Sequence, residues 1–115
     1  MIKLEEKFIG TGEVKGFEFE KIRENEYAFV YKVSYKNEEG ISNYWYEVFE
    51  KRISKETDTT IGGVEVHFDA KEIYPKANSF GIWAWTCETL DRVLKLYTKI
   101  SNDLEEKANN KQLLT

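Results

Sequence analysis

The chain has 115 residues, of which 41% are hydrophobic, 15% aromatic and 33% charged. This balance is typical of one folded domain with its own core, and it excludes a disordered chain. The 17 basic and 21 acidic residues are interspersed and leave a net charge of −4, which argues against broad binding to a phosphate backbone.

The single cysteine and the first residues of the chain bear on the compartment. Cys87 has no cysteine partner, so an intramolecular disulfide is excluded and a reducing compartment is favoured. Residues 1–10 mix charged with apolar side chains and lack the apolar core and cleavage site of a secretory signal. No apolar run reaches the length of about 18 residues that would span a membrane. We therefore expect a cytoplasmic protein with no membrane partner.

Alternating apolar and polar residues predict the first strands. Residues 14–22 place two phenylalanines on one side and glutamates on the other. After a polar turn near Asn25, residues 27–36 form the clearest strand, with five large side chains on one face: Tyr27, Phe29, Tyr31, Val33 and Tyr35. The segment 37–40, NEEG, ends in glycine and suits a hairpin return.

This hairpin return sets a register for the next strand, 41–49. With Lys36 opposite Ile41, one face of the pair collects large side chains: Val33 opposite Tyr44, Tyr31 opposite Tyr46, and Phe29 opposite Val48. We expect this tyrosine-rich face to pack against a helix, where burial of each aromatic side chain contributes roughly 1.5–3 kcal/mol.

Beyond this hairpin the sequence is more polar. Residues 54–60, SKETDTT, predict a mobile loop, and the glycine pair 62–63 predicts a turn or bulge. Alternation returns at 64–68, VEVHF, and a short strand at 71–74 is stopped by Pro75.

The segment 80–97, FGIWAWTCETLDRVLKLY, predicts an amphipathic helix that follows two tryptophans. Thr86 can supply the N-cap oxygen. On a 3.6-residue wheel the apolar arc consists of Leu90, Val93, Leu94, Leu96, Tyr97, Ile100 and Leu104. Periodicity fades beyond this arc, so we expect a single domain over 1–105 and a mobile tail over 106–115.

Glu65, His67 and Asp69 form the one grouping that resembles a catalytic or metal site. Strand alternation would place the three side chains on one face, with neighbours roughly 6–7 Å apart. A solvent-facing strand explains the same pattern, and a transition-metal site would need carboxylates from elsewhere. Cys87, near the predicted helix start, has no local base to make it a nucleophile. No P-loop, GxGxxG or GxSxG motif occurs, so we expect no enzyme activity, no cofactor and no metal.

Exposed tryptophans offer a second kind of site. We expect one of Trp83 and Trp85 to be buried against the helix and the other to be partly exposed. A tryptophan that projects outward beside a basic side chain can grip a protein partner or stack on bases. The candidate binding residues are Trp45, Trp83, Trp85, Lys32 and Arg52, with Lys76 as a further basic neighbour.

Three segments carry a resemblance to a known group: GEVKGFEFEKI, YEVFEKR and YPKANSFGIWAWTCETLDRVL. Through them the chain resembles small uncharacterised proteins carried by bacteriophages and integrated elements of anaerobic bacteria. The resemblance covers most of the chain and centres on the junction between GIWAW and the helix. It implies a cytoplasmic accessory protein and carries over no active-site residue.

The predicted elements add up to an α+β domain, with a curved, mainly antiparallel sheet of four to six strands and one long C-terminal helix packed across it. We expect a non-enzymatic binding or adaptor protein that acts on a host protein. One alternative is a nucleic-acid-binding module in which five basic residues surround exposed aromatics: Lys21, Arg23, Lys32, Arg52 and Lys76. Another is a small enzyme that uses the face of Glu65, His67 and Asp69. An exposed sheet edge would also allow a homodimer.

Overall fold

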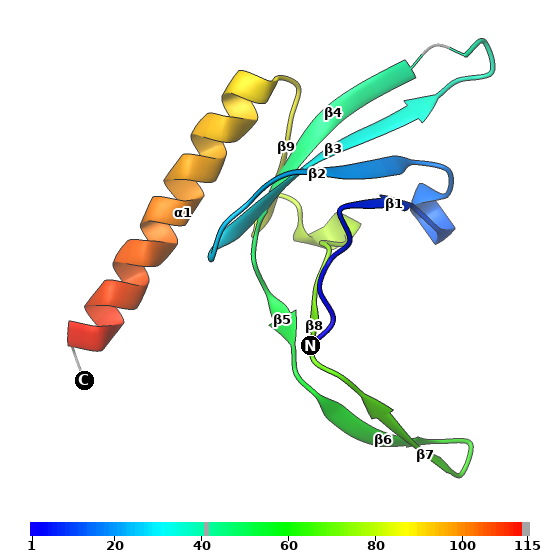
Figure 1. Cartoon of the computed structure of the whole chain (residues 1–115), viewed down its shortest axis with the longest axis vertical. Coiled ribbons are helices and arrows are strands. Elements are labelled where there is room, and N and C mark those ends of the chain that lie inside the picture. Colours follow the sequence, from blue (N-terminus) through cyan, green and yellow to red (C-terminus); the bar gives the residue numbers. More distant parts are fainter. Residues whose placement is uncertain (41, 114–115) are drawn as a thin grey trace.

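The computed structural model describes residues 1–40 and 42–113, and its main feature is a five-stranded antiparallel sheet with a helix packed on it (Figure 1). The sheet is open, and its strand order is β1-β2-β3-β4-β9. Its elements are β1 (Lys7–Ile9), β2 (Glu18–Glu24), β3 (Ala28–Lys36), β4 (Ser42–Glu50) and β9 (Ala84–Cys87), followed by helix α1 (Leu90–Leu113). The predicted α+β class, antiparallel sheet and C-terminal helix are confirmed.

Short strands and 3-10 turns make up the remaining regular structure of the described residues. β5 (Ile53–Ser54) pairs with β8 (Lys71–Glu72), and β6 (Thr57–Ile61) pairs with β7 (Val64–Phe68). The 3-10 turns are η1 (Gly12–Val14) and η2 (Ala77–Ser79). Within the described ranges, no helix has both the length and the apolar character needed to cross a membrane.

Helix α1 covers one face of the sheet, where small and branched side chains of the central strands meet the apolar side of the helix. This helix-side core consists of Ala28, Val30, Tyr46, Val48, Val93 and Ile100. Val30, Val48 and Val93 are fully buried, and burial of each contributes roughly 1.5–3 kcal/mol. The predicted apolar arc is confirmed except at Leu90, which is exposed, whereas the other residues of the arc are buried or half-buried.

The opposite face of the same strands carries a larger, aromatic core. Its buried members are Phe19, Phe29, Tyr31, Val33, Phe49, Trp83 and Ala84. Residues before and within β1 and residues after β8 pack over it, among them Leu4, Phe8, Tyr74 and Phe80. The Tyr31 hydroxyl donates a 2.7 Å hydrogen bond to the carbonyl of Glu5, which ties the first residues to this core. The prediction that the tyrosine-rich face of β3 packs against the helix is therefore wrong.

The register of β3 with β4 also differs by one residue from the prediction. The observed pairs include Phe29 with Phe49, Tyr31 with Glu47, and Val33 with Trp45. Lys36 pairs with Ser42, and its predicted partner, Ile41, lies outside the described residues. The prediction assumed one apolar face, but Tyr46 and Val48 belong to the helix-side core and Phe49 to the aromatic core. A one-residue shift in register changes which side chains share a face of the sheet. Because alternate residues of β4 are apolar and lie in different cores, both faces of the sheet are buried.

Helix α1 begins later than predicted. The hydroxyl oxygen of Thr89 accepts a 3.2 Å hydrogen bond from the N–H of Arg92, so Thr89 is the N-cap. The predicted cap, Thr86, lies in β9 instead. The helix then continues through Leu113, into the segment for which a mobile tail was predicted.

β6 and β7 form a hairpin that projects from the rest of the molecule (Figure 1). The expected loop over 54–60 is a strand from Thr57 onward, because β-branched threonines favour the extended ladder with β7. Gly62 and Gly63 have φ angles of 58° and 81°, the left-handed conformation that a two-residue type I′ turn requires. The projecting elements give a radius of gyration of 16.8 Å, against about 13 Å for a compact chain of similar length.

Charged hydrogen bonds fasten the first residues to β8 and, through Lys51, link β8 to β2. Glu72 is buried, and its carboxylate accepts a 2.9 Å bond from the N–H of Leu4 and lies 3.7 Å from Lys51 Nζ. The Glu24 carboxylate contacts Lys51 at 2.6 Å and Lys21 at 2.8 Å. Burial alone would raise the pKa of Glu24, but these two ammonium groups hold it below its ordinary value.

Candidate functional site

A groove on the aromatic side of the sheet is the candidate functional site. It has a volume of about 620 Å³, is open to solvent and lies between η1 and the segment 74–80. We call it the aromatic groove, and its lining includes Phe17, Phe19, Trp45, Glu47, Tyr74 and Phe80. Hollows with mostly apolar and aromatic walls and a few polar groups are typical of ligand-binding sites.

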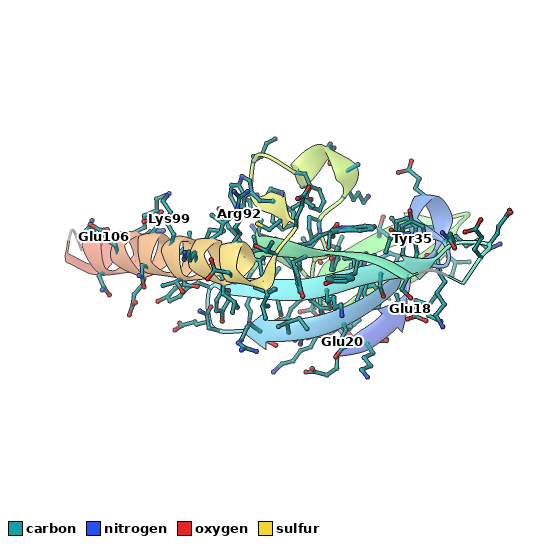
Figure 2. The ribbon with its side chains drawn as sticks, turned by 90° about the horizontal axis from the view of Figure 1, so that it is seen from above. Glu18, Glu20, Tyr35, Arg92, Lys99 and Glu106 are labelled. Atoms are coloured by element: carbon teal, nitrogen blue, oxygen red, sulfur yellow. The ribbon has the colours of Figure 1, made fainter. Side chains whose placement is uncertain are left out.

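The walls of the aromatic groove are built from aromatic contacts. The Phe17 ring stacks on Tyr35 at 5.3 Å and meets the edge of Trp45 at 5.6 Å. Tyr35 lies at the end of the sheet far from α1 (Figure 2). On the other side, the Tyr74 ring packs against Phe19 at 5.1 Å, edge to face. Each such pair contributes about 0.5–1.5 kcal/mol beyond its buried area, so these contacts hold the walls in place without a ligand.

Glu47 is the polar centre of the aromatic groove. Its carboxylate accepts a 2.9 Å hydrogen bond from Trp45 Nε1 and a 2.6 Å hydrogen bond from the Tyr74 hydroxyl. Both donors are neutral, and none of the ion pairs among the described residues involves Glu47. Burial first, and then the Glu47 charge, raise the pKa of Tyr74 well above its ordinary value, so this hydroxyl stays protonated. A carboxylate offers about four lone-pair positions, which leaves acceptor capacity for a ligand.

The η1 turn forms one end of the aromatic groove and depends on Gly10. The N–H of Gly10 donates a 2.8 Å hydrogen bond to the Phe17 carbonyl, and the Gly10 carbonyl accepts one of 3.3 Å from Gly16. A Cβ atom at Gly10 would overlap the carbonyl oxygen of Val14. Glycine at this position therefore lets the chain close on itself and present Glu13 to the groove.

The predicted binding residues do not converge on one site. Trp45 is half-buried and lines the aromatic groove. Trp83 is only 8% exposed, and the Arg52 guanidinium lies 4.7 Å from its ring. Trp85 is half-buried beside the helix-side core. The Lys32 ammonium lies 4.5 Å from a tyrosine ring of β4. Of this set, Trp45 alone belongs to the groove.

The expectation for the two neighbouring tryptophans is right in one respect and wrong in another. One of them, Trp83, is buried and the other, Trp85, is partly exposed. However, Trp83 belongs to the aromatic core on the face away from α1, and Trp85 packs on the helix side. The reason is that β9 begins only at Ala84, so Trp83 lies in the preceding turn and does not follow the alternation of the strand.

Glu47 and Tyr74 are site residues that sequence reasoning missed. In the sequence, Glu47 is one polar residue of a predicted strand, and Tyr74 is the last residue of a short predicted strand before a proline. Their hydrogen bond joins positions 27 apart, and no local pattern signals it. The strand predicted over 14–22 begins only at Glu18, so Phe17 precedes β2, although it packs on the same core as Phe19, as the alternation predicted. Its contact with Trp45 depends on the observed register of β3 with β4.

The basic residues considered for nucleic-acid binding are dispersed in the structure. The Lys21 side chain is only 8% exposed and is paired with Glu24 and Glu6. Arg52 is paired with Glu50 at 3.2 Å. No pocket among the described residues is lined by more than one of the remaining three, Arg23, Lys32 and Lys76.

The projecting hairpin gathers a different set of carboxylates from the one predicted. His67 and Asp69 share a face, and His67 Nε2 lies 3.0 Å from Asp69 Oδ1. Glu56 Oε1 lies 3.0 Å from the same nitrogen, and Asp58 Oδ1 lies 2.6 Å from Nδ1. Glu65 lies opposite Thr60, nearer the turn. The hydrogen bond to Asp58 is the main cause that raises the pKa of His67 above its ordinary value.

Cys87 lies in β9 and not at a helix start. Burial raises the pKa of its thiol, so the thiolate that a nucleophile would need is disfavoured.

Comparison of the chain with protein-family models, with curated proteins and with solved structures finds no match.

Proposed function

We propose that the protein is a non-enzymatic adaptor that binds an extended segment of a partner protein in the aromatic groove. The observation that carries this proposal is Glu47, a half-buried carboxylate in an aromatic-lined groove whose two observed donors are both neutral. The resemblance to mobile-element proteins makes a host protein the expected partner.

The chemistry of the groove favours a basic side chain in the bound segment. Two carboxylates, Glu13 and Glu47, line it against one ammonium group, that of Lys76. Aromatic faces attract cations, and an arginine or lysine can lay its apolar stem along such walls while its charged head reaches a carboxylate. A basic residue flanked by apolar residues is therefore the recognition element that we propose.

Selection from a random peptide library on the purified protein tests this proposal. We expect the selected peptides to be enriched in arginine or lysine next to apolar residues. Their affinities are then measured by fluorescence anisotropy for the wild type and for Glu47→Gln, which removes the charge. Because a hydrogen bond to a charged group contributes about 1.5–3 kcal/mol, we expect binding to weaken about ten- to a hundredfold.

Two charge variants serve as matched comparisons. Lys76→Ala removes the one ammonium group among the described lining residues of the groove and should tighten binding, because its positive charge no longer repels a basic side chain of the peptide. Lys99→Ala removes the same charge from an exposed site on α1 (Figure 2) and should leave affinity unchanged. Before binding is measured, urea denaturation should show that each variant has the same midpoint as the wild type within error.

The opposite results would overturn the proposal. Selected peptides without basic residues would contradict the proposed occupant, and equal binding by Glu47→Gln would place the contact outside the groove. The nucleic-acid-binding alternative is favoured instead if the protein binds a random single-stranded oligonucleotide, if this binding weakens with added salt, and if Lys76→Ala abolishes it.

A further inference from the structure

We propose that the base of the β6–β7 hairpin binds a divalent transition-metal ion such as Zn²⁺ through Glu56, His67 and Asp69. Glu56 immediately precedes β6, and Asp69 immediately follows β7. The ion would join the two strands at the point where they leave the rest of the molecule. This site is separate from the aromatic groove and does not depend on the function proposed for the groove.

The distances between the three ligand atoms suit one ion. His67 Nε2 lies 3.0 Å from Glu56 Oε1 and 3.0 Å from Asp69 Oδ1, and all three atoms lie within 4.8 Å of one another. Two ligands of a tetrahedral zinc ion with bonds of about 2.0–2.1 Å are about 3.3 Å apart. The two separations of 3.0 Å are slightly shorter than this value, and the exposed carboxylates can rotate to meet it. Water would complete the coordination.

The orientation of the imidazole distinguishes this arrangement from an ordinary group of surface carboxylates. Asp58 Oδ1 lies 2.6 Å from His67 Nδ1, so in the neutral ring Nδ1 carries the hydrogen and donates it to Asp58. Without a metal, Nε2 also carries a hydrogen, which lies between the carboxylates of Glu56 and Asp69. A metal ion would take the place of this hydrogen and release it as a proton. A carboxylate behind a histidine in this way is the contact found at metal-bound imidazoles, where it fixes the tautomer and increases ligand basicity.

The charges and the donor types indicate which class of ion would bind. Three carboxylates, those of Glu56, Asp58 and Asp69, surround one imidazole. A divalent cation would neutralise two of these three negative charges. An imidazole nitrogen suits Zn²⁺ and similar transition metals, whereas Mg²⁺ and Ca²⁺ prefer shells of oxygen ligands. The ligand set therefore favours a transition-metal ion over the alkaline earths.

The hairpin would gain order from such an ion. Apart from its own ladder it makes little described contact with the sheet or the helix, and Ile61, Val64 and Phe68 are exposed on it. An isolated two-stranded ribbon is marginal in water. A metal ion coordinated by both strands at the base would stabilise the paired state, because an ion that binds only the formed hairpin lowers the free energy of that state.

The test titrates the full chain, freed of metal by a chelator, with zinc chloride alone at neutral pH. Calorimetry should show saturable one-to-one binding that is much weaker for magnesium chloride. Amide hydrogen exchange should slow in the two strands of the hairpin and stay unchanged in the five-stranded sheet. His67→Asn and Asp69→Asn should each weaken zinc binding at least about tenfold, and Asp58→Asn about ten- to a hundredfold.

Glu65→Gln is the matched control, because Glu65 lies on the same hairpin but outside the ligand set; it should bind zinc as the wild type does. Tryptophan emission reports whether each variant keeps the folded sheet, since the tryptophans lie in β4, β9 and the turn before β9. Absence of saturable binding, equal zinc affinity in His67→Asn, or slowed exchange confined to residues outside the hairpin would each overturn the proposal.

Discussion

The Tyr74 hydroxyl donates a 2.6 Å hydrogen bond to the Glu47 carboxylate, which joins the segment before η2 to strand β4. This hydrogen-bonded pair has both a structural role and a role in the candidate site. It closes the aromatic core, because the Tyr74 ring also packs against Phe49 at 4.8 Å, and it orients the carboxylate inside the aromatic groove.

Replacing Tyr74 by phenylalanine should test the structural part of this role. Tyr74→Phe keeps the ring but leaves the half-buried Glu47 carboxylate with one donor fewer, so we expect a loss of about 1–3 kcal/mol in the free energy of unfolding. Urea denaturation measures it. Tyr44→Phe, at a site that is 55% exposed, should change stability by less than about 0.5 kcal/mol. Equal effects of the two substitutions would contradict the role given to the hydrogen bond.

Alkaline pH should destabilise the protein through two tyrosines. Burial raises the pKa of both Tyr31 and Tyr74 above the ordinary value, which is about 10 in an unfolded chain. Above that pH the unfolded chain binds fewer protons than the folded one, so the free energy of unfolding falls as pH rises. Urea denaturation of the wild type across this range should show the fall, and the double variant Tyr31→Phe, Tyr74→Phe should show a shallower one. Parallel curves would refute the assignment to these residues.

The start of α1 offers a test of the observed cap against the predicted one. Thr89→Ala removes the oxygen that accepts the N–H of Arg92, and loss of an N-cap side chain costs about 1 kcal/mol. Thr86→Ala removes an exposed side chain from β9 and should cost less than about 0.5 kcal/mol. Far-UV circular dichroism during urea denaturation measures both. A larger loss for Thr86→Ala would restore the cap that the sequence suggested.

Gly10→Ala should disturb the end of the aromatic groove. The added methyl group meets the Val14 carbonyl oxygen, and such overpacking costs about 1–3 kcal/mol. Binding of the selected peptides should weaken as well, because η1 must move. Since the obstacle is a backbone atom, shortening the Val14 side chain in the double variant Gly10→Ala, Val14→Ala should restore little of the stability. Full restoration would show that the Val14 side chain sets the limit.

Local patterns in the sequence predicted the elements well. Alternation gave the strands around Phe19 and Phe29, the glycine pair at 62–63 gave the turn of the hairpin, and the 3.6-residue period gave the buried side of α1 around Val93. These features depend on residues close together in the chain, where propensity and periodicity act directly.

The packing of the elements was harder to predict from the sequence, because both faces of the sheet are buried. Alternation in β3 places Phe29 and Tyr31 on one face and Ala28 and Val30 on the other, and every one of the four is fully buried. Hydrophobicity therefore does not distinguish the two faces. Side-chain size does, since α1 packs on the smaller residues and the flat aromatic face receives the chain segments around Tyr74.

The candidate site was predicted only in part for the same reason. Trp45 could be named from its aromatic character, but the groove around it needs the register that pairs Trp45 with Val33 and the segment that carries Tyr74. The hairpin cluster was half predicted. Strand alternation placed His67 beside Asp69, while Glu56 and Asp58 joined them from the paired strand, across a turn whose register the sequence analysis did not assign.

The position of α1 after all the described strands has a consequence for synthesis on the ribosome. The aromatic core can close from segments that are made early, between the first residues and β9. The other face, with Ala28, Val30 and Val48, gains its cover only when Val93 and Ile100 have left the exit tunnel. Until then the nascent sheet presents a strip of apolar surface that is prone to aggregation and open to chaperones, so a pause in translation just before Leu90 would lengthen that exposure.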